Sequence, residues 1–417
     1  MISYNKATEI LKKNKIYIED EIILSKDSIG RVSSRNIKSP NNYPAANNTA
    51  FDGFAINSKE SNNINTHIGK KFKIIKVLAA GDNPKIKKVP KFSCIEVMTG
   101  AIIQKPFDTV IPIENIKYFP NKHKPVYIVV NKRIKKNNNI RFSGSDYKKG
   151  ETVITKGQII QPNHILAFKT LGIEKVLVKR KPKIVFYSTG NEITNNIKIP
   201  NWKVRNSNNH YLKSFLESFP IEFKEKKILR DNDNKKFKKE IKNNLALDID
   251  MVVSSGAVSA GKFDFVPKII KQFKLKKHFK GVRIRPGKPI MFARFKKKMV
   301  FFGLPGNPIS SAACFRFFIL PFLYLSLGAR VDTPIIAKIK STFVKKKNYT
   351  RFIKGRLLFS NKGRAEFKVF KGQESYKINP FSKSNSWGFF PHGKTIFKKG
   401  TFIKCYSSTG INELFIK

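Results

Sequence analysis

Two loops rich in glycine and small hydroxyl residues, both in the second half of the chain, carry the residue types best suited to chemistry. One covers residues 254–261 and the other residues 303–310, and each follows a short apolar run that predicts a buried strand. Glycine and serine let backbone N–H groups approach an anion closely, as they do at many phosphate sites. The two loops therefore predict a surface that binds a phosphate or another oxyanion.

Acidic side chains accompany these loops. Glu192 follows the small-residue turn 188–190, Asp231 follows another predicted strand, and Asp264 lies just past the first glycine loop. Carboxylates beside an anion site are electrostatically reasonable when Mg²⁺ lies between them and the substrate phosphates. We therefore expect Glu192, Asp231 and Asp264 to hold Mg²⁺ beside a phosphorylated ligand. The alternative for each acid alone is a solvated residue at a helix start, where the helix dipole favours it.

A stiffened basic turn lies between the two loops. Pro286 and Gly287 separate Arg285 from Lys288, so both cations would project from one turn. In a chain with 83 Lys and Arg residues, a basic pair has little weight by itself. The Pro-Gly framing favours a role for this pair in binding the anion.

The order of predicted elements indicates four domains in an α/β multidomain chain. Alternating strands and helices predict a three-layer α/β domain with a mostly parallel sheet, which binds ligands where its strands end. Short β-like runs between turns predict two further β-rich domains. The predicted domains are an extended helical N-terminal and linker domain (1–50 with 141–181), a small β-rich domain (51–140), the α/β domain (182–328) and a C-terminal β-barrel-like domain (329–417). A helix is expected over residues 4–23. Within the α/β domain, a strand is expected around residues 226–229 and a helix over residues 265–273.

The net charge of +55 over 417 residues is the unusual feature of the composition. Such an excess usually indicates nucleic acid, a membrane surface or acidic ligands. Here the lysines are spread along the whole chain and accompany abundant Asn, Ile and Phe, all encoded by AT-rich codons, so we interpret the excess as compositional drift. No basic stripe or nucleic-acid-reading motif is evident, and no specific nucleic-acid partner is expected.

The cysteine and apolar patterns indicate the cellular compartment in which we expect the protein. Cys94, Cys314 and Cys405 are isolated, so they predict neither a zinc site nor a disulfide. The longest apolar run, residues 312–327, is interrupted by an arginine and a proline and is shorter than the about 20 residues that cross a membrane. It predicts a buried helix. The first fifteen residues lack the apolar segment of a signal peptide, and we expect a cytoplasmic protein with no membrane partner.

Several segments, in this order, resemble the signature blocks of molybdopterin molybdenumtransferases, the bacterial molybdenum insertases that are similar to the C-terminal domain of gephyrin. They are Asn48 to Ala55, Met98 to Ala101, Ser188 to Glu192, residues 254–261 with Asp264, Arg285 to Pro289, and Gly303 to Ser310. The resemblance runs from about Tyr4 to the C-terminus. The related molybdopterin adenylyltransferases share only the loops of the third domain, so the N-terminal blocks decide between the two families.

The resemblance implies an elongated homodimer with four domains per chain. Its active cleft would lie between the molybdopterin-binding α/β domain of one subunit and the small β domain of the other. The implied reaction joins molybdate to the dithiolene of adenylylated molybdopterin, with Mg²⁺-dependent release of AMP and formation of molybdenum cofactor. Docking with other proteins of molybdenum-cofactor biosynthesis is implied as well.

The resemblance, carried over residue by residue, also implies the site. Its catalytic set is Asp52, Thr99, Asp146, Glu192, Asp231 and Asp264. Its substrate-binding set is Ser188, Thr189, Gly190, Ser255, Gly256, Ser259, Gly261, Arg285, Lys288, Gly303, Pro305, Gly306, Asn307, Pro308 and Ser375. Asp52 and Thr99 would reach the cleft from the small β domain, whereas Asp146 would lie on the connecting segment. The metal ligands remain Glu192, Asp231 and Asp264.

Five positions depart from the family pattern. Ser145, Asn47, Asn191 and Asn206 stand where the family usually has acids, and Ala257 replaces a glycine. Losing a supporting carboxylate costs roughly 10–100-fold in metal affinity or activity. The first alternative to an active enzyme is therefore a catalytically weakened binding or scaffold protein of the same fold. The second is a basic nucleic-acid-binding protein.

Overall fold

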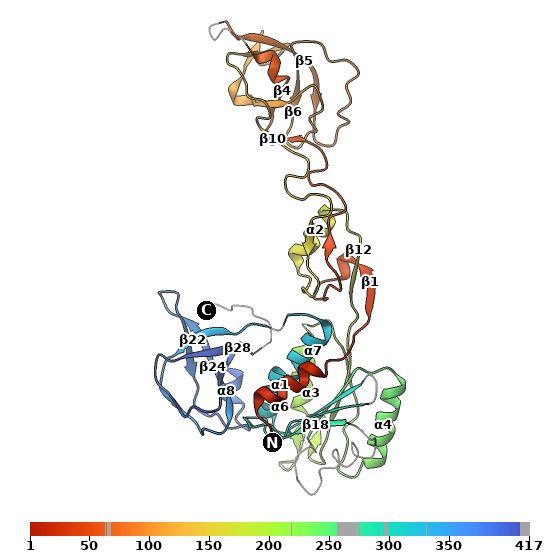
Figure 1. The fold of residues 1–417 in the computed structure, drawn as a ribbon, viewed down its shortest axis with the longest axis vertical. Coiled ribbons are helices and arrows are strands. Elements are labelled where there is room, and N and C mark those ends of the chain that lie inside the picture. The colour runs from red at the N-terminus through yellow and green to blue at the C-terminus, as the bar shows by residue number, and fades with distance from the viewer. Residues whose placement is uncertain are drawn as a thin grey trace.

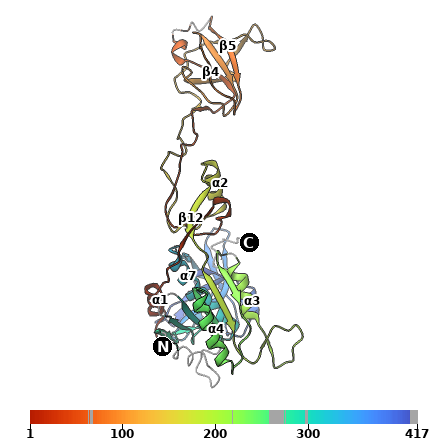
Figure 2. The same cartoon turned by 90° about the vertical axis from the view of Figure 1, so that its right-hand side faces the viewer.

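The computed structural model is elongated, with its domains arranged along the long axis (Figure 1). The small β domain stands apart from the α/β and C-terminal domains in both views (Figures 1 and 2), and the extended domain lies between them. The structure describes residues 1–62, 64, 68–217, 219–256, 273, 276–295, 299–330 and 332–408.

The small β domain contains a six-stranded sheet with the strand order β7-β4-β6-β5-β9-β8. Its strands are β4 (Gly53–Ile56), β5 (Lys70–Leu78), β6 (Ser93–Val97), β7 (Thr109–Pro112), β8 (Lys117–Phe119) and β9 (Tyr127–Val130), with short 3₁₀ turns η2 (Ser58–Ser61) and η3 (Ile113–Asn115). Alternate residues of β4 enter two different apolar clusters, Phe54 in one and Ala55 in the other. Each face of the sheet therefore carries an apolar cluster.

The extended domain is built from short antiparallel pairings between its two chain segments. Its elements are α1 (Tyr4–Lys13), β1 (Asp20–Leu24), η1 (Ser25–Asp27), β2 (Ile37–Lys38), β3 (Asn48–Thr49), β10 (Ile140–Arg141), β11 (Thr152–Ile154), α2 (Pro162–Thr170) and β12 (Lys175–Lys179). The pairs are β1 with β12, β2 with β11, and β3 with β10. The two chain segments of the extended domain therefore run side by side toward the small β domain.

The expectation of one helix over residues 4–23 is wrong. The helix ends at Lys13, and Asn14 closes it by donating to the carbonyl of Ile10. Residues Asp20–Leu24 form β1 instead, because the β-branched pair Ile22-Ile23 matches β12, with Ile22 opposite Leu177. Ala7 and Leu11 of α1 pack into the core of the α/β domain.

The α/β domain has a six-stranded sheet with the order β16-β13-β17-β21-β20-β18. Its strands are β13 (Lys183–Ser188), β16 (Glu222–Glu225), β17 (Met251–Ser255), β18 (Lys276–Lys280), β20 (Met291–Arg294) and β21 (Val300–Leu304), and β14 (Ile193–Thr194) pairs with β15 (Val204–Arg205) outside the sheet. Its helices are α3 (Ser207–Leu216), α4 (Asn234–Ala246), α6 (Pro308–Cys314), the π-helical η4 (Phe315–Ile319) and α7 (Leu320–Leu327). The first four strands of the order are parallel, as predicted.

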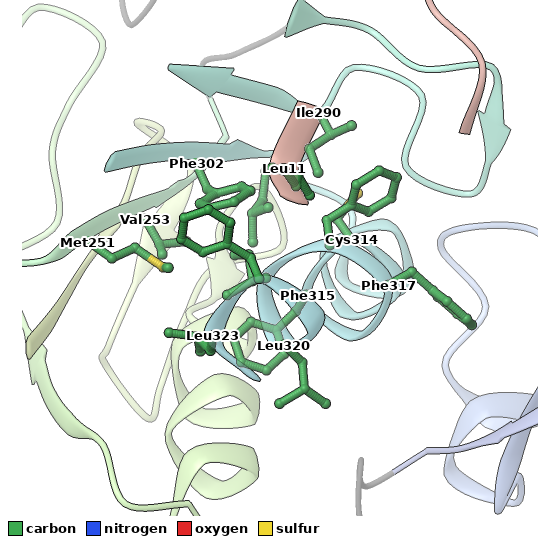
Figure 3. Packing of buried hydrophobic residues seen from close by; sticks show 14 of the residues in the cluster. Leu11, Met251, Val253, Ile290, Phe302, Cys314, Phe315, Phe317, Leu320 and Leu323 are labelled. Carbon is green, nitrogen blue, oxygen red and sulfur yellow. The ribbon is translucent and has the colours of Figure 1, made fainter. Parts of the chain in front are cut away.

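Helices cover both faces of this sheet. On one face Met251, Val253 and Phe302 pack against Phe315 and Leu320 of the long helical segment (Figure 3). On the other face α4 covers an apolar cluster of its own. The segment Pro308–Leu327 is apolar and long enough to cross a membrane, but 89% of its most apolar window is buried inside the protein, so it is the predicted core helix.

Two predicted elements of this domain need comment. The strand expected around residues 226–229 lies earlier, at β16, where Glu222–Glu225 pairs with β13 and Phe223 packs against the core. Leu229 makes only an isolated bridge to Thr189. The helix expected over residues 265–273 falls almost wholly outside the described residues.

The C-terminal domain is a closed β-barrel, as the sequence predicts. Its strands β24, β25, β22, β28 and β26 pair in that order, and β26 returns to pair with β24. The bounds are β19 (Ile284–Arg285), β22 (Ile335–Ile339), β23 (Phe343–Val344), β24 (Thr350–Phe359), β25 (Ala365–Val369), α8 (Asn379–Ser382), β26 (Ser386–Phe390), β27 (Ile396–Phe397) and β28 (Phe402–Ser407). Strand β19 comes from the α/β domain and pairs with β24, so the two domains share a sheet.

A buried ion pair also joins these two domains. Arg316, from the middle of the long helical segment, is 1% exposed and binds the carboxylate of Asp332 in the connection to the barrel. Its Nε atom donates to the carbonyl of Ser407 at 2.7 Å. The guanidinium therefore links the core helix, the interdomain connection and the last barrel strand.

We expect Arg316→Met to lower the free energy of unfolding by about 3–5 kcal/mol, because it leaves the Asp332 charge buried without its partner. Urea unfolding monitored by circular dichroism measures the change. The double variant Arg316→Met/Asp332→Leu removes both charges and should recover part of the loss. A loss below about 1 kcal/mol in the single variant would contradict this role.

Candidate functional site

A cavity of about 570 Å³ lies where the parallel strands of the α/β domain end. In the strand register Ser188 of β13 stands beside Ser255 of β17, and Ser255 stands beside Leu304 of β21. The three strands therefore end at one level, and the segments that follow them meet. The predicted residues that line the cavity are Ser188, Thr189, Gly190, Glu192, Asp231, Ser255, Gly256, Pro305, Gly306, Asn307 and Pro308.

Short hydrogen bonds hold the three segments together. The Gly256 N–H donates to the carbonyl of Leu304 at 2.9 Å. The backbone N–H and hydroxyl of Thr189 both donate to the carbonyl of Ser255, at 3.0 and 2.9 Å. A Cβ added at Gly256 would lie 2.6 Å from the Thr189 carbonyl oxygen. Only a residue without a side chain fits there, because Gly256 also has φ +94°.

Asn208 is a cavity residue that the sequence analysis missed. Its amide Nδ2 atom donates to Ser255 Oγ at 2.6 Å and to the carbonyl of Gly306 at 2.9 Å. One side chain at the start of α3 therefore ties both glycine loops together. The only signal in the sequence was a polar residue at a predicted helix start, which the capping preference of asparagine explains as well.

The two described acids of the cavity are held differently. The carboxylate of Glu192 folds over Gly190, where an added Cβ would lie 2.5 Å from Glu192 Oε2. Asp231 is half-buried, and its backbone N–H donates to Asn191 Oδ1 at 3.2 Å. Arg230 fixes this turn because its Nη1 atom donates to three carbonyl oxygens of residues 190, 191 and 193. Both residues line the same cavity.

This donor set fits Mg²⁺ in chemical type. Mg²⁺ prefers oxygen ligands and is commonly held by one or two carboxylates together with substrate phosphates. Glu192 and Asp231 are such carboxylates, and hydroxyl and amide oxygens surround them. In the part of the chain that the structure describes, no group of three acidic, His or Cys residues gathers as a complete metal site. Asp264, the third predicted ligand, lies outside the described residues, as do Ser259 and Gly261.

The basic turn lies beside the cavity. Pro289 lines the wall, whereas Arg285 and Lys288 are exposed and are not part of it. The guanidinium of Arg285 lies 4.9 Å from the ring centre of Tyr349 in the barrel. Gly303 is buried inside β21, one residue before the strand ends, and supports the loop from below. Ser375 comes close from the barrel, since Asn307 Nδ2 donates to its hydroxyl at 3.1 Å.

The remaining predicted residues lie in the upper part of the molecule. Asp52 and Thr99 are adjacent on the small β domain, where the backbone N–H and hydroxyl of Thr99 donate to Asp52 Oδ1 at 2.6 and 2.8 Å. The bond from the Thr99 backbone N–H lowers the pKa of Asp52 most, and the bond from the Thr99 hydroxyl lowers it further. Asp146 lines a separate cavity of about 1040 Å³ between the extended and small β domains. Within one chain none of the three reaches the first cavity.

Comparisons with known proteins decide the family. Residues 2–172 match the MoeA N-terminal region (domain I and II), and residues 186–324 match a probable molybdopterin binding domain. A molybdopterin molybdenumtransferase of Staphylococcus epidermidis is 28% identical over 96% of this chain and 94% of its own length. One from Synechocystis is 27% identical over 98% and 100%. The chain belongs to the molybdopterin molybdenumtransferase family.

The fold agrees with this membership. A crystal structure of the molybdopterin biosynthesis protein MoeA from Pyrococcus horikoshii has a TM-score of 0.82 with this chain at 24% identity, and the match covers 98% of this chain and 99% of that one. A second crystal structure of that protein has a TM-score of 0.80 at 25% identity. The N-terminal match separates the chain from proteins that contain only the molybdopterin-binding domain.

The amides that depart from the family pattern still accept hydrogen bonds. Ser188 Oγ donates to Asn206 Oδ1 at 2.5 Å, and the Ser143 N–H donates to Asn47 Oδ1 at 2.9 Å. Asn191 Oδ1 likewise accepts from the Asp231 N–H. At each position the amide oxygen thus accepts a hydrogen bond that a carboxylate oxygen could also accept, but without the negative charge. Asn206 also donates to Asn195 Oδ1 at 3.0 Å, a bond that an ionised carboxylate could not make.

We expect Gly256→Ala to lower the free energy of unfolding by about 1–3 kcal/mol more than Gly150→Ala does, because the new Cβ meets the Thr189 backbone. Gly150 is the matched control, since its φ is also positive at +86° and nothing lies within 4 Å of an added Cβ. Urea unfolding of both variants measures the difference. Equal losses would show that the loops are not packed as tightly as described.

We expect Thr99→Val to raise the pKa of Asp52 toward the ordinary value for an aspartate, because the hydroxyl donor is lost. The rise should be incomplete, since the Thr99 N–H still donates. In the wild type the lowered pKa keeps Asp52 charged to a lower pH than usual. A ¹³C NMR titration of the carboxyl group measures the shift, with Thr152→Val as control. No change in Thr99→Val would contradict the assigned hydrogen bond.

Proposed function

We propose that this protein is a molybdopterin molybdenumtransferase that inserts molybdate into adenylylated molybdopterin, with Mg²⁺-dependent release of AMP. The observation that carries this proposal is the cavity whose lining combines Ser255 and Gly256 of the first glycine loop, residues 305–308 of the second, and the acids Glu192 and Asp231. Both substrates are anions, one a pyrophosphate-linked nucleotide and the other an oxyanion. The cavity suits them because its loops place main chain and small side chains, rather than bulky groups, against the ligand.

The residues of the cavity have separable roles in this proposal. The helical segment that begins at Pro308 directs the positive end of its dipole toward the phosphates. Ser188, Thr189 and Ser255 place hydroxyl groups along the strand ends. Each hydroxyl already donates within the protein, to Asn206, to the Ser255 carbonyl and to the Pro305 carbonyl respectively, so these groups shape the cavity wall. Glu192 and Asp231, with Asp264, would hold Mg²⁺, which supplies charge neutralisation at the phosphates when it is bound. Arg285 and Lys288 would attract molybdate at the rim.

The small β domain contributes to this site from a second subunit. The small β domain, which carries Asp52 and Thr99, stands apart from the α/β domain of its own chain (Figure 1), yet both residues lie within the match to the MoeA N-terminal region. A homodimer in which the small β domain of one subunit approaches the α/β domain of the other would complete the cleft. We place this dimer in the cytoplasm, where it could dock with other proteins of the pathway.

The test of the reaction is release of AMP from adenylylated molybdopterin on addition of molybdate and Mg²⁺. We expect Asp231→Asn to reduce this release at least about tenfold without unfolding the protein, because it removes a metal ligand. Asp248→Asn, at the opposite end of the sheet, is the matched control and should leave the rate unchanged. Wild-type rates in Asp231→Asn would remove the proposed metal role.

We expect subunit mixing to restore activity. Asp52→Ala and Asp231→Ala should each be inactive alone, because in a homodimer of either variant both clefts contain the substitution. After unfolding and refolding at equal amounts, half of the dimers are mixed and each has one intact cleft, so about a quarter of the wild-type activity should return. No recovery on mixing would show that the two residues act within one chain.

The second candidate is a catalytically weakened binding or scaffold protein of the same fold. The amides at Asn191 and Asn206 favour it, because they lower the negative charge around the metal ligands. Tight binding of adenylylated molybdopterin without release of AMP would support this candidate. A role in nucleic-acid binding would instead require a specific complex that survives physiological salt.

A further inference from the structure

A lysine buried in the C-terminal barrel binds two main-chain carbonyl groups of a turn that lies near the cavity. Lys354 on β24 is 1% exposed, and its ammonium donates to the carbonyls of Glu374 and Lys377, at 3.1 and 2.9 Å. Burial lowers its pKa to about 8, with Lys377 and Arg351 adding to the effect and Glu374 opposing it. Burying this cation is costly because the ammonium group is removed from water. An apolar side chain would fill the same space without that cost.

The turn at residues 372–377, whose carbonyls Lys354 binds, is also attached to β24 through Gln373. The side chain of Gln373 accepts from the Lys354 N–H at 2.9 Å and donates to the Lys354 carbonyl at 2.8 Å. It also donates to the carbonyl of Phe370 at 2.7 Å. The amide thus pairs with the backbone of β24 as a neighbouring strand would. Residues 372–377 are therefore anchored at both ends of the turn.

The anchored turn carries Ser375 to the cavity of the neighbouring domain. Asn307 Nδ2 donates to Ser375 Oγ at 3.1 Å, and Asn307 lines the cavity and begins the long helical segment. A continuous set of contacts thus runs from the ammonium of Lys354 through the turn to the cavity edge. The same strand pairs with β19, where Arg285 stands opposite Arg351. Strand β24 therefore contacts both the turn that carries Ser375 and the basic turn beside the cavity.

We propose that Lys354 is a positioning residue, which clamps residues 372–377 so that Ser375 and Asn307 shape the edge of the substrate cavity. The proposal rests on the proposed function, because it assigns the clamp to binding of the adenylylated substrate at that cavity. Lys354 does not touch the substrate. It acts through the turn, and its loss should therefore affect substrate binding more than the chemical step.

The kinetic experiment compares Lys354→Met, Lys354→Arg, Ser375→Ala and the double variant Lys354→Met/Ser375→Ala. Lys354→Met should raise KM about tenfold and change kcat less than about threefold, because it frees the turn without removing a reacting group. Lys354→Arg should restore part of the loss, since a guanidinium can donate to both carbonyls. The double variant should be little worse than either single variant, because both break one set of contacts.

Phe397→Leu is the control for general damage, since it weakens the barrel core without touching the turn. It should leave KM unchanged at a temperature where it remains folded. Hydrogen exchange measured by mass spectrometry over residues 371–378 gives a readout independent of turnover. Exchange there should rise in Lys354→Met and stay at the wild-type rate in Phe397→Leu.

The outcomes separate the clamp from the proposed function. A wild-type KM in Lys354→Met, additive effects in the double variant, or unchanged exchange over the turn would each overturn the clamp. If the wild type releases no AMP, the reaction is wrong. The clamp is then decided by the exchange data and by the Kd for adenylylated molybdopterin, which should rise about tenfold in Lys354→Met.

Discussion

The parallel pairing of β13, β17 and β21 is the constraint on which the rest of the site depends. Because the three strands are in register, Ser188, Ser255 and Leu304 end at one level, and everything that follows them is forced into one small space. Such crowding is possible only where side chains are small or absent, which is why Gly190 and Gly256 stand there. The anion binding that we propose would then be a consequence of sheet topology, since main chain and small side chains are what remain at the strand ends.

Much of the fold could be predicted because its signals are local. Alternating strand and helix patterns in the second half predict a parallel sheet, and short runs between turns predict the small β domain and the barrel, both of which the structure contains. The error at residues 4–23 has a simple cause. Apolar spacing compatible with a helix continues past Asn14, and only the partner strand β12, 150 residues later, makes Asp20–Leu24 extended.

The site was predictable as a set of loops but not as a set of contacts. Glycine-rich segments after predicted strands, with acids beside them, predicted that Gly256, Gly306 and Asp231 lie together. All three line one cavity in the structure. Asn208 and Lys354 escaped notice because their roles come from hydrogen bonds to carbonyls distant in the sequence, and a carbonyl has no sequence signature. The distance between Asp52 and the cavity also has no local signal, since it depends on the length of the paired connection through the extended domain.

The elongated shape gives a physical reason for the division of the site that we propose. The small β domain has an apolar cluster on each face of its sheet, and Asp52 and Thr99 are hydrogen-bonded to each other within this domain. The paired segments of the extended domain hold it away from its own α/β domain, and β19 and Arg316 fasten the barrel beside the cavity. The barrel thus meets the edge of the cavity through the hydrogen bond from Asn307 to Ser375, whereas the small β domain stands apart and, in the dimer that we propose, would close the cavity of another chain. Binding of the substrate at such a cleft would favour the dimer, because ligand binding stabilises whichever state contains the complete site.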